Sequence, residues 1–71
     1  MKASDVKPGE CYRTANNWVR HVAYIEEGKV LYRSRGSKDE AGWISTGLLQ
    51  FQKLSLFAYD AIEPVAANWE P

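Results

Sequence analysis

The sequence predicts a small, mainly β domain in which a strongly twisted antiparallel sheet precedes one short C-terminal helix. Turn-forming residues divide the first two thirds of the chain into short segments. These segments alternate in polarity and are rich in β-branched and aromatic residues, as strands are. In the last third, apolar residues recur instead at the three- and four-residue spacing of a helix.

Three strands are expected in the first half of the chain. Pro8 and Gly9 have the chemistry of a type II turn and would introduce the first strand. Asn16 and Asn17 form the next break, because asparagine tolerates left-handed backbone, and Gly28 closes a second hairpin. The predicted strands cover residues 10–15, 18–27 and 29–35. Together they should form an antiparallel meander.

Strict alternation assigns the side chains of the second strand to two faces. One face would carry Trp18, Arg20, Val22 and Tyr24, and the other Val19, His21, Ala23 and Ile25. After a polar loop over residues 36–42, the segment 43–45 is predicted to begin a fourth strand. Residues 47–52 would continue this strand after a bend at Gly47.

The helix is predicted over residues 55–63. The apolar stripe that indicates it consists of Leu54, Phe57, Ala58, Ala61, Ile62 and Val65. Ser55 would be its N-cap, with Leu54 and Tyr59 packed as a hydrophobic staple, and Pro64 would end it. The alternative is a strand, because "LSLFAYDAI" also contains good strand formers.

The chain of 71 residues has room for one domain, 1–71, with an ordered core over about 6–63. The tail, 66–71, has only Trp69 to anchor it. No apolar run approaches the roughly 18 residues of a membrane span, and the N-terminus lacks the apolar core of a secretory signal. We therefore expect a cytoplasmic protein. The single cysteine, Cys11, excludes an internal disulfide.

No motif of a nucleophilic, metal-dependent or phosphate-binding enzyme occurs in the sequence. Cys11 and His21 lie on adjacent predicted strands and are the one pair that resembles a nucleophile and its base. The simpler interpretation is a small buried cysteine and a histidine of the sheet. We expect a non-enzymatic protein without a cofactor or a metal site.

The charges are unevenly distributed although their sum is zero. Residues 1–38 carry eight Lys/Arg and four Asp/Glu, giving +4, and residues 39–71 carry one lysine and five Asp/Glu, giving −4. Such asymmetry indicates either contact with a polyanion or pairing between the two halves.

The candidate binding residues come from the predicted sheet. They are Arg13, Arg20, Leu31, Arg33, Arg35 and Trp43. Arginine with aromatic residues is typical of single-strand nucleic-acid platforms and of protein interfaces, whereas solvated arginines paired with glutamates would bind nothing. Which arginines share a face depends on a strand register that the sequence leaves open.

The stretch "VLYRSRG", residues 30–36, contains two of these arginines on one predicted strand. Arg33 and Arg35 are predicted on the exposed face. Leu31 shares that face by alternation, so either a bulge turns it inward or it lies at the surface beside two arginines. An exposed leucine in that setting is typical of a protein interface.

The opening "VKPGECYR" has a V-x-P-G-x-x-Y pattern before a meander, and it resembles the small SH3-like barrels. The stretch "YRTANNWVRHVAYIEEGKVLYRSRG" also resembles small uncharacterised proteins of bacteria and their phages, over about residues 6–62. The resemblance implies a barrel and a binding role, with no specific function to transfer. The hypothesis is a binding module for a protein partner or for itself, and the alternative is a nucleic-acid-binding barrel.

Overall fold

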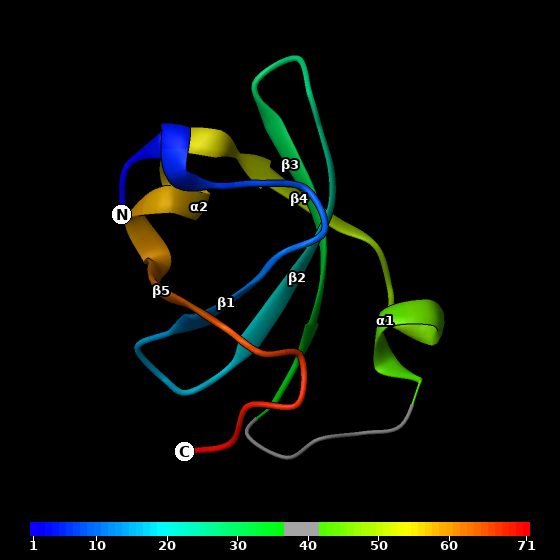
Figure 1. Ribbon diagram of the computed structural model, residues 1–71. Coiled ribbons are helices and arrows are strands. Elements are labelled where there is room, and N and C mark those ends of the chain that lie inside the picture. Colours follow the sequence, from blue (N-terminus) through cyan, green and yellow to red (C-terminus); the bar gives the residue numbers. More distant parts are fainter. Residues whose placement is uncertain (37–41) are drawn as a thin grey trace.

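The computed structural model describes residues 1–36 and 42–71, which form an open five-stranded antiparallel sheet with two short α-helices (Figure 1). The elements are η1 (Ala3–Asp5), β1 (Cys11–Thr14), β2 (Val19–Glu26), β3 (Lys29–Arg35), α1 (Trp43–Thr46), β4 (Gln50–Lys53), α2 (Leu54–Asp60) and β5 (Ala61–Val65). The strand order is β4-β3-β2-β1-β5. The mainly β class is therefore confirmed, whereas a closed SH3-like barrel is not, because the sheet does not close.

The predicted meander of β1, β2 and β3 is confirmed, and local backbone chemistry explains both of its turns. Asn17 adopts a left-handed φ of 65° between β1 and β2. Glu27 and Gly28, with φ of 51° and 74°, connect β2 to β3. Positive φ at both central residues is typical of a two-residue type I′ hairpin, whose twist matches that of the strands.

The V-x-P-G-x-x-Y pattern has a physical explanation in the fold. Gly9 has the left-handed φ of 84° that its turn requires. The buried hydroxyl of Tyr12 accepts a hydrogen bond from the N–H of Lys7 at 2.7 Å and donates one to the carbonyl of Asp5 at 3.1 Å. The tyrosine thus ties the N-terminal segment to the sheet.

The predicted strand at residues 43–45 is wrong, because this segment forms the helix α1. Gly42, in the left-handed region, precedes the helix, and the hydroxyls of Ser45 and Thr46 donate hydrogen bonds to its carbonyl. The helical turn places Trp43 against the sheet, where it is buried. The fourth strand begins only at Gln50 and pairs with β3. The predicted loop 36–42 lies mostly outside the described residues.

The helix predicted in the C-terminal third is confirmed as α2, but its boundaries differ from those expected. The residue at its N-cap is Lys53, so Ser55 lies inside the helix. Tyr59 is 84% exposed and forms no staple. The helix ends at Asp60 because residues 61–65 pair with β1 as the edge strand β5. An edge strand tolerates Pro64, whose missing N–H removes no bond from the interior of the sheet.

A β-bulge in β2 changes the predicted distribution of side chains. The register with β3 shifts between Val22 and Tyr24, so these two residues do not share a face as alternation predicted. Val22 packs in the core with Ile25, and Tyr24 pairs with Leu31 on the opposite face. The bulge therefore lies in β2 and not at Leu31 of β3. Leu31 and Arg33 consequently stay on the same face of the sheet.

Each face of the sheet is only partly covered. The main core lies between the sheet and α2, and it comprises Val6, Tyr12, Val22, Val30, Tyr32, Phe57, Ala58 and Ala61. On the other face, which we call the α1 face, Cys11, Val19 and Trp43 pack with residues of α1 and of the C-terminal segment. Figure 1 shows α1 and α2 on opposite sides of the sheet, displaced toward opposite ends of the strands. Neither described helix has the length and apolar character needed to span a membrane.

Candidate functional site

The candidate arginines do not converge on one surface. The registers of β1, β2 and β3 place Arg13, Arg33 and Arg35 on the α1 face and Arg20 on the α2 face. Strand alternation alone could not establish this, because the assignment depends on how each hairpin is aligned.

Arg35 is buried, so the prediction that it lies on the exposed face is wrong. Only 3% of the residue is exposed. Its guanidinium donates hydrogen bonds to the carbonyls of Ala67 and Trp69 and lies 5.6 Å from the ring centroid of Trp43. The cation is buried because the C-terminal segment folds back over it. Arg35 and the buried Trp43 therefore hold the fold together, and Trp69 packs beside them.

Arg13 and Arg20 each bind an acidic residue of the C-terminal third. Arg13 forms an ion pair of 2.8 Å with Glu63 and lies 5.8 Å from the ring centroid of Trp69. Arg20 lies 3.7 Å from a carboxylate oxygen of Asp60. The two halves of opposite charge thus pair with each other, which is one of the two interpretations that the sequence allowed.

Arg20 also borders two adjoining hollows on the α2 face. These have volumes of about 380 and 240 Å³ and share Thr14, Asn16 and Arg20 in their walls. The guanidinium donates a hydrogen bond of 3.1 Å to Gln52 and lies 4.9 Å from the ring centroid of Tyr32. Because Arg20 is engaged by these neighbours and by Asp60, it does not offer a free cation to a ligand.

Cys11 and His21 meet across the sheet without the features of a catalytic pair. They are directly paired in the register of β1 and β2. Burial raises the pKa of the Cys11 thiol, with a smaller contribution from Glu10, whereas a cysteine nucleophile needs a lowered pKa. Burial, followed by the charge of Arg33, lowers the pKa of His21. Both groups are thereby kept neutral near pH 7.

Within residues 1–36 and 42–71, no three His, Cys, Asp or Glu side chains gather as metal ligands. Arg33 is half-buried, and its Nε donates a hydrogen bond of 3.1 Å to the carbonyl of Gly47. Arg33 thus lies beside the C-terminal end of α1, and Leu31, two residues earlier on β3, lies on the part of the α1 face that leads away from α1.

An uncovered apolar row lies on this part of the α1 face. Phe51 of β4 pairs with Leu31 of β3, and Leu31 pairs with Tyr24 of β2. We call these residues the Phe–Leu–Tyr row. Phe51 is 68% exposed and Tyr24 is 44% exposed, while Leu31 between them is half-buried. Three apolar side chains thus cross three strands side by side at the surface.

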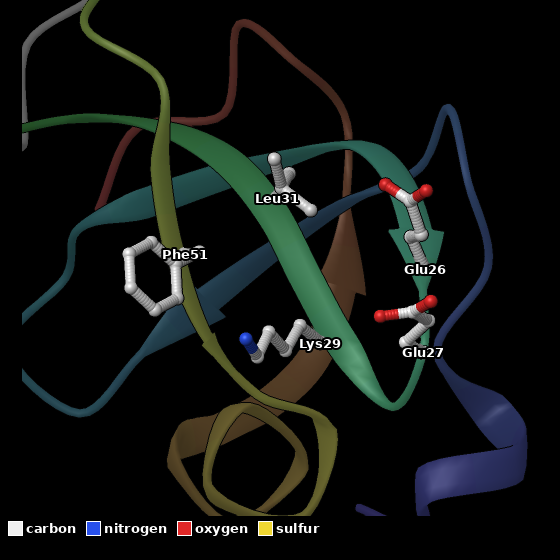
Figure 2. A pocket seen from close by; sticks show the side chains of 5 residues that line it. All are labelled: Glu26, Glu27, Lys29, Leu31 and Phe51. Atoms are coloured by element: carbon white, nitrogen blue, oxygen red, sulfur yellow. The ribbon is translucent and has the colours of Figure 1, made fainter.

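A charged row runs beside the apolar row, at the end of the sheet where β2 turns into β3. Lys53 pairs with Lys29, and Lys29 pairs with Glu26, which Glu27 follows in the turn. We call these four residues the charged row. Figure 2 shows Lys29 between Phe51 and the two glutamates, around a hollow of about 240 Å³. The Nζ of Lys29 lies 5.6 Å from the ring centroid of Phe51.

The four side chains of the charged row form no ion pair in the described part of the chain, although Glu26 lies directly opposite Lys29 in the register of β2 and β3. Neither Glu26 nor Glu27 forms an ion pair with any residue of 1–36 or 42–71. The same holds for Lys29 and Lys53 among these residues. The row therefore presents two cations and two anions to solvent beside an apolar strip.

Of this surface, sequence reasoning identified Leu31 and missed its neighbours. The alternation in "QFQK", residues 50–53, was a usable signal, because it separates Phe51 from the flanking glutamines. Tyr24 was assigned to the wrong face because the bulge is invisible to simple alternation. Comparison of the chain with protein-family models, with curated proteins and with solved structures found no significant match.

Proposed function

We propose that this protein is a non-enzymatic binding module whose Phe–Leu–Tyr row contacts a protein partner. The observation that carries the proposal is the uncovered row itself, with Phe51 and Tyr24 exposed on either side of Leu31. Aromatic and aliphatic side chains that form a contiguous exposed strip with a charged border have the composition of a protein interface, with an apolar centre and a polar rim.

An SH3-like architecture is part of this proposal. It is supported by the meander that follows the V-x-P-G-x-x-Y opening and by the return of β5 to pair with β1. In an open sheet of this kind the strands present one continuous face to a partner, and the helices leave part of that face free.

The nucleic-acid alternative has weaker support. A single-strand binder needs cations along a groove beside stacking aromatics. Here the arginines divide between two faces, and Arg13, Arg20 and Arg35 are engaged by carboxylates or carbonyls of the chain itself. The net charge of zero also disfavours contact with a polyanion.

Site-specific photo-cross-linking in a cell extract tests the proposed function. A photoreactive phenylalanine analogue replaces Phe51 in one variant and Leu56 in a control, because Leu56 is 52% exposed but belongs to α2. The variant at residue 51 should cross-link to a polypeptide, either another protein or a second copy of the chain, and the control should not. Equal yields from both positions, or adducts that nuclease removes, would contradict the proposal.

A further inference from the structure

We propose that the partner of the Phe–Leu–Tyr row is a second copy of this chain, in a symmetric dimer whose sheets pack face to face. This inference rests on the proposed function, because it assigns an occupant to the same surface. It is carried by the order of charges across the charged row and by the absence of an ion pair at its four side chains within the described residues.

The charged row is complementary to itself when reversed. Across β4, β3 and β2 the order is Lys53, Lys29, Glu26, and Glu27 follows Glu26 in the turn between β2 and β3, so the positive charges lie toward β4 and the negative charges toward β2. A copy that runs in the opposite direction presents its negative charges toward the positive charges of the first. With the two-fold axis between β2 and β3, Lys29 of each copy faces Glu26 of the other, so this contact occurs twice, as an isologous interface requires.

Strand geometry allows this arrangement together with apolar contact. A two-fold axis that lies in the interface, parallel to β2 and β3, brings the two α1 faces together and reverses the row direction. It places Tyr24 of each copy over Leu31 of the other, with Phe51 at the edge of the contact. Because both α1 helices then lie at the same end of the dimer, the two sheets meet at the ends that carry the rows and diverge toward α1. Aromatic side chains packed in this way lose exposed surface on both copies, and sheets that pack face to face with nearly aligned strands are common.

The isolated chain carries an unfavourable pair that the dimer would relieve. Lys29 and Lys53 are directly opposite each other on β3 and β4, and like charges at such positions destabilise a sheet. A glutamate from the second copy would neutralise this pair. A domain of 71 residues also has a small core, and small domains are often stabilised further by oligomerisation.

Two oppositely charged variants test the inference. In the first, Glu26→Lys and Glu27→Lys make the charged row entirely positive; in the second, Lys29→Glu and Lys53→Glu make it entirely negative. All four residues are exposed, so both variants should fold, which circular dichroism checks. Sedimentation equilibrium should show a dimer for the natural chain. Each variant alone should dissociate about tenfold or more readily, and an equimolar mixture of the two should form a heterodimer.

The outcomes separate this inference from the proposed function. A natural chain that stays monomeric up to ~1 mM, or a dimer that both variants form unchanged, overturns the inference. So does a mixture of the variants that remains monomeric while the natural chain dimerises. If the chain is monomeric and the analogue at residue 51 still cross-links to a different polypeptide, only the inference fails. If that position gives no polypeptide adduct, the proposed function fails as well.

Discussion

At the scale of single residues, the same residue type has different roles according to what folds over it. Arg35 is buried because the C-terminal segment returns across it and accepts its hydrogen bonds. Arg33, two residues earlier on the same strand and face, bonds only to the carbonyl of Gly47 among the described residues and stays half-buried. Arg35 also binds the carbonyl of the adjacent Gly36, but the carbonyls of Ala67 and Trp69 that cover it lie more than thirty residues away. The sequence "RSR" therefore contains no local signal for this difference.

His21 should make stability depend on pH. Its folded pKa lies below the usual 6.5, first because of burial and second because of Arg33. The unfolded chain therefore binds more protons, so the contribution of His21 is complete above about pH 6.5 and is lost as the pH falls through the folded pKa.

Urea unfolding at a series of pH values between about 5 and 8 measures this effect. The midpoint should fall with decreasing pH in the natural protein. It should change less in the variant His21→Gln, which cannot titrate. Cys11, which pairs with His21 across the strands, is neutral throughout this range and does not contribute to the change. If the midpoints of the two proteins fall equally with pH, a group other than His21 causes the dependence.

At the scale of elements, the sequence was a good guide wherever structure is set by nearby residues. The meander and its turns followed from Asn17, Gly28 and strand composition, and α2 followed from its apolar spacing. The elements that were missed depend on distant contacts. The segment at Trp43 has strand-forming residues but folds as a helical turn that packs its indole against the sheet, and β5 forms by pairing with β1, which lies near the other end of the chain.

The hairpin between β2 and β3 carries residues of both the Phe–Leu–Tyr row and the charged row, and Gly28 is essential to the turn of this hairpin. The replacement Gly28→Ala should lower the free energy of unfolding by about 1 kcal/mol, because φ of 74° is unfavourable for any residue with a Cβ. An added Cβ meets no atom within 4 Å, so the backbone alone accounts for the cost.

Gly36→Ala is the matched control for this prediction. Gly36 also has no atom within 4 Å of an added Cβ, but its φ does not lie in the left-handed region. Its replacement should leave stability unchanged or raise it slightly, since alanine restricts the unfolded chain. Chemical denaturation compares the two variants, and equal losses of stability would contradict the assigned turn conformation.

At the scale of the whole molecule, the candidate site is defined by which part of each face of the sheet the helices leave uncovered. One helix covers each face, at opposite ends of the strands, so each face keeps an open part (Figure 1). On the α2 face the open part surrounds Arg20, which the chain itself engages. On the α1 face the open part holds the Phe–Leu–Tyr row and the charged row, whose side chains are charged or present exposed aromatic surface and form no ion pair with residues 1–36 or 42–71.

The most direct test of self-association through this face is a dilution series followed by ¹H–¹⁵N NMR. Between dilute and concentrated samples, amide shifts should change at residues 24, 29, 31 and 51 and stay constant around Trp18 and Tyr59. The variant Phe51→Ser should show no such changes, whereas Tyr59→Ser, at an exposed site on α2, should behave as the natural protein does. Spectra that are independent of concentration, or shifts that cluster around Arg20 instead, would contradict the account.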